Sequence, residues 1–190
     1  MKKIALFASG NGSNFQAIVD EIEKGALAAV IAVLVTDKPH CFAVERARKH
    51  NIPVFSFVPK NYPSKDEYER EIAFYLIEKN VSLIVLAGYM RLVGEVLLTA
   101  FPNRIINIHP TLLPAFPGKN GIKQAFDYGV KIFGVTVHYV DAGVDTGKII
   151  AQESFKPEEN ETLQEIEEKI HAIEYQLYVK VIREHFVSLC

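Results

Sequence analysis

The chain has 190 residues, with 21 Lys and Arg against 23 Asp and Glu, and 49% of its residues are apolar. This length suits one domain with a substantial core. A chain with a net charge of -2 lacks the positive field that would attract nucleic acids or anionic membranes. Cys41 and Cys190 cannot form a disulfide scaffold, so a reducing cytoplasm is the expected compartment. No apolar run approaches the roughly 20 residues of a membrane span, so we expect neither a membrane nor a nucleic-acid partner.

Short apolar runs alternate with amphipathic segments in the first half of the chain, which is typical of a parallel sheet covered on both faces. Five strands are expected over 4–8, 30–35, 53–58, 82–87 and 104–108. The helices expected between them cover 13–25, 42–50, 64–80 and 93–100. Capping boxes at Ser13 and Ser64 predict where two of these helices begin. The predicted fold class is α/β, with an open, mostly parallel, twisted sheet.

The pattern changes in the second half of the chain. Residues 110–121 contain three prolines and two glycines without periodicity, which is typical of a functional loop. A short helix over 122–128 is expected to end at Gly129. Strands over 133–140 and 148–155 flank a turn-like segment and are expected to pair as an antiparallel hairpin. A third capping box at Thr162 predicts a final helix that runs to about residue 187.

A glycine-rich segment, Gly10–Asn14, lies between the first strand and the first helix. Glycines let a ligand approach the backbone, and a helix N-terminus offers N–H groups and partial positive charge, so the segment suits a phosphate. It is not a dinucleotide fingerprint, because Phe15 stands where the third glycine would be, and it is not a P-loop, because no lysine follows. A tight turn in which Ser13 only caps the helix is an equally good interpretation.

Asn107 and His109 lie two residues apart at the carboxyl end of the fifth strand, so they point to the same face. Ligands of open α/β sheets bind beyond that end. Asn107 could donate to an oxyanion, His109 could donate or carry a proton, and a nearby carboxylate from Asp145 would stabilise the imidazolium. The alternatives are a hydrogen-bonded histidine that closes a strand and an aspartate that serves only its turn.

The remaining histidines show no metal-ligand spacing, and no activated serine or cysteine signature is present, so neither a metal nor a covalent nucleophile is expected. These histidines are His40, His50, His138, His171 and His185.

Four segments together resemble the folate-dependent formyltransferases: Gly10–Asn14, Leu86–Arg91, Asn107–Pro114 and Asp145–Gly147. The resemblance runs from residue 3 to about residue 186, and the chain looks like the branch that formylates glycinamide ribonucleotide. It implies a Rossmann-like formyltransferase fold in one domain, 1–190, with a phosphate-binding part over 1–104 and a catalytic and folate-binding part over 105–190. It also implies direct transfer of the formyl group of the cosubstrate 10-formyltetrahydrofolate to the ribonucleotide amine in purine (IMP) biosynthesis.

The same resemblance implies roles for particular residues. Asn107 and protonated His109 would hold the oxyanion, Asp145 would orient His109, and a water molecule would relay the proton. The ribonucleotide phosphate would lie on Gly12, Ser13 and Asn14. Glu174, which the sequence pattern alone presents as a solvated helix residue, would contact the ribonucleotide.

The folate-binding positions that the resemblance implies are Lys65, Met90, Arg91, Leu92, Val93, Asn107, Val140, Asp141 and Val144. Lys65 and Asn120 stand where some members of the family have arginine and histidine, so the contacts made by those members do not transfer to these two positions.

Other functions remain open on the sequence. A formyltetrahydrofolate hydrolase is expected to carry an N-terminal regulatory domain, and a methionyl-tRNA formyltransferase to carry a further RNA-binding domain, whereas this chain is expected to be the core alone. A nucleotide-binding module without catalysis would not need Asn107, His109 and Asp145. The expected partners are therefore small molecules, glycinamide ribonucleotide and 10-formyltetrahydrofolate, bound by a monomer or homodimer.

Overall fold

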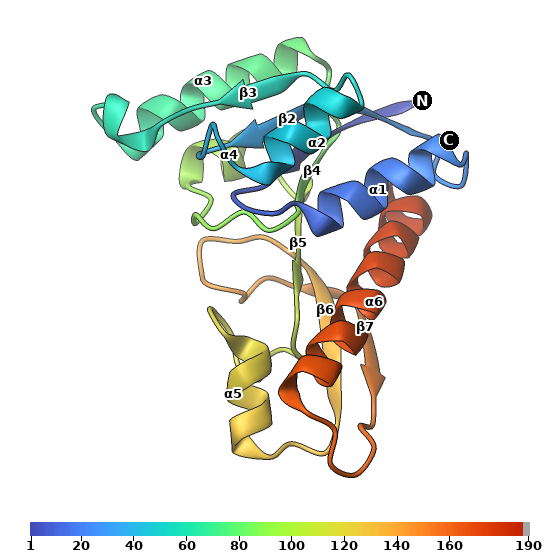
Figure 1. Cartoon of the computed structure of the whole chain (residues 1–190). Helices are drawn as coiled ribbons and strands as arrows, with labels where there is room; N and C mark the ends of the chain where they lie inside the picture. The colour runs from blue at the N-terminus through green and yellow to red at the C-terminus, as the bar shows by residue number, and fades with distance from the viewer. Residues whose placement is uncertain (188–190) are drawn as a thin grey trace.

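A computed structural model describes residues 1–187, and Cys190 lies outside them. Seven strands form one sheet in the order β3-β2-β1-β4-β5-β6-β7 (Figure 1). The strands are β1 (Lys2–Phe7), β2 (Ala29–Thr36), β3 (Val54–Ser56), β4 (Leu83–Leu86), β5 (Ile105–His109), β6 (Phe133–Tyr139) and β7 (Ile149–Phe155). The helices are α1 (Ser13–Glu23), α2 (Phe42–Lys49), α3 (Lys65–Glu78), α4 (Glu95–Ala100), α5 (Gly121–Tyr128) and α6 (Leu163–Val181), with a 3-10 turn η1 (Pro59–Asn61) and a π-helical turn η2 (Ile182–Val187).

The sheet confirms the predicted α/β class. Strands β1 to β5 pair in parallel, β6 runs antiparallel to β5, and β7 pairs with β6 as the predicted hairpin. The edge strand β3 is shorter than expected, because only three of its residues, 54–56, pair with β2. Pro53 lacks the N–H that would extend this ladder toward the N-terminus.

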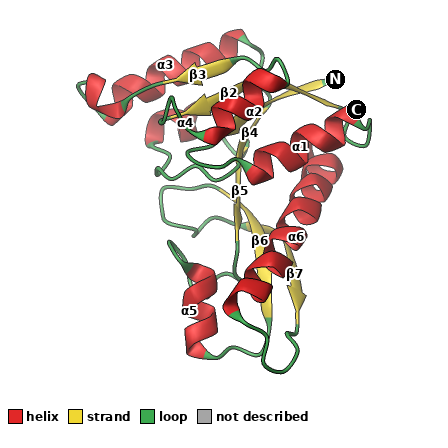
Figure 2. Ribbon diagram, in the orientation of Figure 1, coloured by secondary structure: helices red, strands yellow, loops and turns green. Residues whose placement is uncertain are grey.

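Alternation along β1 creates two apolar cores, one on each face of the sheet. Ile4 and Leu6 belong to a core to which α1, α2, α5 and α6 contribute, whereas Ala5 and Phe7 belong to a core to which α3 and α4 contribute. All four side chains are essentially buried. In Figure 2, β2 and β3 lie between α3 and α1. A parallel strand that is covered on both faces reads as a continuous apolar run, which is why its pattern was visible in the sequence.

Four predicted helix caps can be compared with the structure, and they have different outcomes. Both hydrogen bonds of the capping box at Thr162 are present: its side chain accepts the Glu165 N–H, and the Glu165 side chain accepts the Thr162 N–H. At the predicted cap of α3, the Ser64 hydroxyl accepts the Glu67 N–H at 3.3 Å. Gly129 closes α5 with a φ of 81°, as predicted. The capping box at Ser13 is wrong: the N-cap is Gly12 with a φ of 73°, and Ser13 is the first helical residue. The left-handed turn that only glycine adopts easily places the N-cap one position earlier.

The order in which strands are added to the sheet changes direction between β1 and β4. From β1 it proceeds to β2 and β3 on one side and then returns to β4 on the other. The loops after β1 and β4 therefore diverge at the carboxyl ends of neighbouring strands, which is where open α/β sheets bind ligands.

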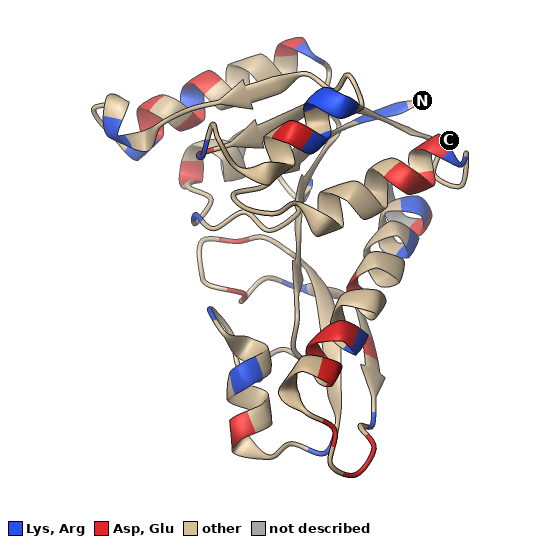
Figure 3. Cartoon of the chain, viewed as in Figure 1, with Lys and Arg blue, Asp and Glu red and all other residues tan. Residues whose placement is uncertain are grey.

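Acidic and basic residues are mixed along the helices at both ends of the molecule, which agrees with the near-neutral charge (Figure 3). Within residues 1–187, no helix combines the length and the apolar character needed to cross a membrane.

Candidate active site

A cavity of about 1080 Å³ lies beyond the carboxyl ends of β4 and β5. Its wall is built from the loop after β4, the end of β5, the loop before α5, the β6–β7 turn and one side of α6. This volume is at the upper end of the range for small-molecule sites. Most predicted catalytic and folate-binding residues line it: Met90, Arg91, Leu92, Val93, Asn107, His109, Val140, Asp141, Val144 and Asp145.

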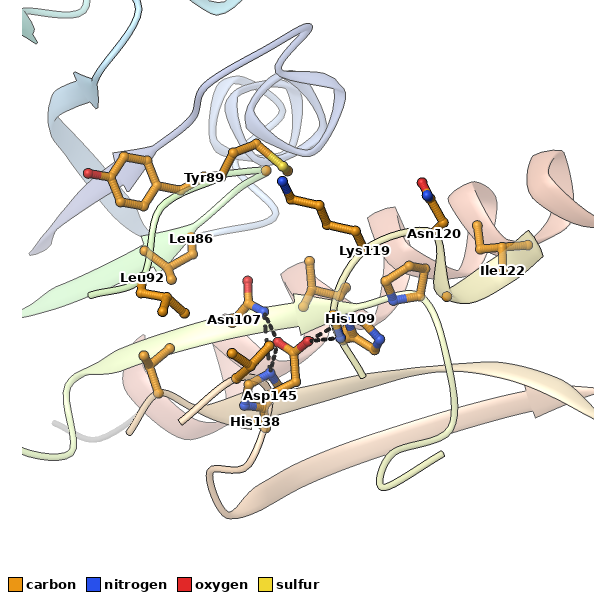
Figure 4. Close-up of a pocket in the computed structure, with 18 of the residues that line it drawn as sticks. Leu86, Tyr89, Leu92, Asn107, His109, Lys119, Asn120, Ile122, His138 and Asp145 are labelled. Atoms are coloured by element: carbon orange, nitrogen blue, oxygen red, sulfur yellow. Dashed lines mark hydrogen bonds and ion pairs between the residues drawn. The ribbon is translucent and has the colours of Figure 1, made fainter. Parts of the chain in front are cut away.

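Asp145 is the centre of a polar cluster in this cavity (Figure 4). Its Oδ2 lies 3.2 Å from Nδ1 of His109 and accepts the Gly118 N–H at 2.8 Å. Its Oδ1 accepts from Nδ2 of Asn107 at 3.3 Å and lies 3.6 Å from Nε2 of His138. The structure therefore brings together Asn107, His109 and Asp145, which are up to 38 residues apart in the chain.

Asp145 is held in its ionised form. Burial raises the pKa of Asp145, but its contact with His138, the Gly118 N–H and the charge of His109 outweigh burial and lower it. A carboxylate that stays charged can stabilise positive charge on an adjacent imidazole.

Both ring nitrogens of His109 face acceptors. Nε2 lies 2.9 Å from the Phe116 carbonyl oxygen, which can only accept, and Nδ1 faces the Asp145 carboxylate. A ring N–H that meets one of these acceptors is the kind of donor that an oxyanion requires. Because the Phe116 carbonyl occupies Nε2, a substrate oxygen can accept from that nitrogen only after this loop carbonyl moves.

His138 is a member of the cluster that the sequence did not predict. Its side chain is buried, its Nδ1 donates to the Tyr139 carbonyl at 2.8 Å, and its Nε2 lies 3.3 Å from Nδ2 of Asn107. The signal was the antiparallel pairing of β5 with β6, which places His138 directly opposite Asn107. A sequence search for metal-ligand spacing does not detect a pair formed across two strands.

The folate-side residues that were predicted form an open, partly apolar wall. Met90, Leu92 and Val144 are exposed apolar side chains on its rim. Large exposed apolar side chains that line a cavity mark a binding surface more strongly than isolated ones do. Lys65 does not line this cavity; its Nζ lies 3.9 Å from the buried carboxylate of Glu69.

Arg91 and the backbone beside it are held from behind the cavity. The Asp37 carboxylate lies 3.8 Å from the Arg91 guanidinium and accepts the Ser9 hydroxyl at 2.6 Å. That hydroxyl in turn accepts the Met90 N–H at 3.0 Å. One buried serine therefore joins the loop after β1 to the loop after β4.

The predicted phosphate-binding segment, Gly10–Asn14, does not line the cavity, but it directly follows Ser9, which is hydrogen-bonded to Met90 on the cavity wall. Two observations explain why position 12 is a glycine. Its φ of 73° lies in the left-handed region, and a Cβ there would lie only 2.8 Å from Cβ of Ala43. The N-cap residue of α1 is Gly12, which has no side chain to cap the helix, and the first turn has no acidic residue. Oδ1 of Asn14 is buried and has no hydrogen-bond partner among the described residues. Because this oxygen can only accept, it is available to a hydroxyl or N–H donor of a ligand and not to a phosphate oxygen.

Glu174 is not the solvated helix residue that its sequence pattern indicated. It is 5% exposed, and its Oε2 accepts from Nδ1 of His171 at 2.7 Å. His171 lies on the wall of the cavity, so the pair reaches the site from α6. This hydrogen bond raises the pKa of His171 more than burial lowers it. Helical periodicity alone did not predict that Glu174 is buried, because the buried face of a helix is recognised by its apolar residues and a glutamate on that face gives no such signal.

Within residues 1–187, no group of three or more His, Cys, Asp or Glu side chains is arranged to hold a metal ion. The polar groups of the cavity are hydrogen-bond donors beside a carboxylate. Such groups can stabilise the charges that develop during acyl transfer.

Comparison with known proteins places this geometry in a family. Residues 2–182 match the family described as formyl transferase. The phosphoribosylglycinamide formyltransferase of Bacillus subtilis (strain 168) is 52% identical over 184 residues, which cover 97% of this chain and 94% of the relative. The crystal structure of glycinamide ribonucleotide transformylase 1 from Geobacillus kaustophilus superposes with a TM-score of 0.93 at 52% identity, covering 96% of this chain and 97% of that chain. The phosphoribosylglycinamide formyltransferase of Bacillus halodurans gives a TM-score of 0.90 at 51% identity, with 96% of each chain covered. This chain therefore belongs to the formyl transferase family.

Proposed function

We propose that the protein transfers the formyl group of 10-formyltetrahydrofolate to the amino group of glycinamide ribonucleotide, giving formylglycinamide ribonucleotide and tetrahydrofolate. The observation that carries this proposal is the cluster of Asn107, His109 and Asp145 on the wall of a large cavity at the ends of two parallel strands. Relatives named for this reaction, with half of their residues identical over nearly the whole chain, support the choice of substrates.

The reaction is an acyl transfer in which one C–N bond replaces another. The ribonucleotide amine attacks the formyl carbon, and the carbonyl electron pair moves onto oxygen. When the tetrahedral intermediate collapses, the bond to N10 of the folate breaks, and a proton passes from the attacking nitrogen to N10. The protein must therefore stabilise an oxyanion and allow a proton to move between two nitrogens.

The cluster supplies groups for both requirements. Once the Phe116 carbonyl has moved away, protonated His109 donates from Nε2 to the oxyanion, and the Asn107 amide contributes the hydrogen that is not given to Asp145. The Asp145 carboxylate keeps positive charge on His109 and fixes its ring, and a water molecule relays the proton. One donor of this kind is typically worth about 10²–10³ in rate.

The two substrates would occupy different parts of the site. The folate would lie on the wall formed by Met90, Arg91, Leu92, Val93, Val140, Asp141 and Val144, with Lys65 beyond the cavity at the same end. The ribonucleotide phosphate would lie on Gly12, Ser13 and Asn14, whose backbone N–H groups have no capping side chain. Glu174 would approach the ribonucleotide from α6.

The test is to mix the protein with 10-formyltetrahydrofolate in the presence and absence of glycinamide ribonucleotide. We expect folate consumption and formylated ribonucleotide only when both substrates are present. Consumption without the ribonucleotide would identify a formyltetrahydrofolate hydrolase. Binding of the ribonucleotide without any consumption would identify a nucleotide-binding module.

The site is formed within one chain, so either a monomer or a homodimer is compatible with the proposed activity. Light scattering would distinguish the two. We place the reaction in the cytoplasm, because Cys41 is a free thiol and the substrates are small metabolites.

A further inference from the structure

The segment Gly10–Asn14 carries no charged side chain, yet a guanidinium from another helix is bound to it. Nε of Arg46, on α2, donates to the Asn11 backbone carbonyl at 3.0 Å. Nη2 of the same guanidinium donates to the Asn11 side-chain oxygen, also at 3.0 Å. The fork of Arg46 therefore holds both oxygens of the residue that precedes Gly12.

A third donation fixes the guanidinium relative to α1. Nη1 of Arg46 donates to Oε1 of Gln16 at 3.1 Å, and Nε2 of Gln16 donates to Asp20 at 2.7 Å. The guanidinium also lies over the Phe42 ring, 4.7 Å from its centre. Because three oxygens and a ring surround it, Arg46 has a defined position and is not a freely moving surface cation.

Helix α2 also packs directly against the segment. The Ala43 N–H donates to the Gly10 carbonyl at 3.1 Å, and the backbone of Gly12 approaches Ala43 so closely that no side chain fits. Arg46 follows Ala43 by three residues, so both lie on the same side of α2. The segment is thus shaped from the α2 side by one close backbone contact and one cation.

We infer that Arg46 is a positioning residue for the ribonucleotide phosphate, an inference that rests on the proposed function. Its fork turns the two oxygens of Asn11 toward itself, and oxygens left free there would repel an incoming phosphate. The N–H groups at the start of α1 are then left to the anion. Its charge also compensates for the absence of a lysine in the segment.

Three variants test this role by steady-state kinetics with both substrates and by calorimetric titration with ribose 5-phosphate as the phosphate probe. Arg46→Gln should raise the KM for glycinamide ribonucleotide and the Kd for ribose 5-phosphate about 10-fold or more. The KM for 10-formyltetrahydrofolate and kcat at saturation should stay within about threefold. Arg46→Lys keeps the charge but loses the fork, so its effect should be smaller but still several-fold.

Arg48→Gln is the matched control. Arg48 lies on the same helix, is exposed, and its guanidinium makes no hydrogen bond or ion pair within the described part of the chain, so its variant should match the wild type. A ribonucleotide KM within twofold of wild type in Arg46→Gln would overturn the inference, as would equal shifts in both substrates or in both Gln variants. Wild-type protein that binds ribose 5-phosphate without transferring formyl would refute the proposed function alone. Wild-type protein that transfers formyl but does not bind the probe would refute the inference and leave the proposed function standing.

Discussion

Asp145 adopts a left-handed backbone conformation with a φ of 54°, which aspartate tolerates better than most residues. The turn that imposes this conformation also directs the carboxylate at His109 and His138. The turn interpretation of this residue is confirmed, and its catalytic role stays a prediction that these contacts support. Its backbone serves the turn, and its side chain serves the cluster.

Replacing Asp145 by asparagine should lower kcat on the order of 10³-fold, because the substitution keeps the shape but removes the charge that supports protonated His109. The KM of each substrate should change only a few-fold, since the lost interaction acts on charge that develops in the transition state. Steady-state kinetics measure both effects. Asp127→Asn, an exposed carboxylate paired with Lys123 on α5, is the control. A turnover within tenfold of wild type would contradict the assignment of Asp145.

His171 and Glu174 should make stability depend on pH. The pKa of His171 is raised in the folded state, so the stabilisation is fully present below the unfolded value of about 6.5 and is lost as the pH rises through the folded pKa. The melting temperature of the wild type should therefore fall more between about pH 6 and about pH 8.5 than that of His171→Gln. The exposed His40→Gln variant should keep the wild-type slope. Equal slopes in all three proteins would exclude this linkage.

At the scale of elements, α4 begins on a carboxylate supplied by α3. Glu69 is 2% exposed and accepts the N–H groups of Gly94 at 2.7 Å and Leu97 at 3.5 Å. Burial raises the pKa of Glu69 more than these donors and Lys65 lower it. The loop that carries Met90 to Val93 leads directly into this helix, so the position of that part of the cavity wall, to which we assign the folate, depends on Glu69.

Glu69→Ala should destabilise the fold by about 1–3 kcal/mol, because two buried donors lose their acceptor. It should also raise the KM for 10-formyltetrahydrofolate while leaving that for the ribonucleotide nearly unchanged. Urea unfolding and steady-state kinetics give the two quantities. Glu69→Gln, which keeps an acceptor oxygen, should recover part of both losses. A folate KM that does not move in Glu69→Ala would show that α4 does not position the wall.

Helix α6 connects the two halves of the sheet from one side. The Tyr178 hydroxyl lies 3.0 Å from the Leu86 carbonyl of β4 and 3.1 Å from the Ile106 carbonyl of β5. These two strands end at the cavity, so a single buried phenol fixes their spacing just behind the site. The same helix places His171 on the cavity wall with Glu174 hydrogen-bonded to it, which gives α6 a part in the site as well as in the core.

At the scale of the whole molecule, the sheet separates two cores that share no side chains. Ile170 of α6 lies in one core and Ile72 of α3 in the other, and both are fully buried. Ile72→Val and Ile170→Val should each lower the free energy of unfolding by about 0.5–1.5 kcal/mol. The double variant should lose the sum within about 0.5 kcal/mol, because the two sites share no contacts. Urea unfolding of the four proteins completes the cycle, and a coupling above about 1 kcal/mol would show that the cores communicate through the sheet.

Several elements were predictable because their signals are local. The apolar run of β4, the cap at Thr162 and the C-terminal Gly129 of α5 depend on neighbours within a few residues, and all three are confirmed. The first residue of α1 agrees with the expected range, but the predicted N-cap at Ser13 is wrong by one position, because Gly12 adopts the left-handed conformation and is itself the N-cap. Glu174 was misread because its burial depends on what packs against α6.

The sequence by itself determined the α/β class and the succession of strands and helices along the chain. It also determined that Asn107 and His109 lie on the same face of their strand, because side-chain alternation in a strand is a local rule. Only the tertiary structure decided which groups surround that pair. His138 arrives by pairing of β6 with β5, Asp145 by the turn beyond it, and Arg46 by packing of α2 on the glycine-rich segment. Such contacts depend on the relative placement of segments far apart in the chain, which local propensities do not encode.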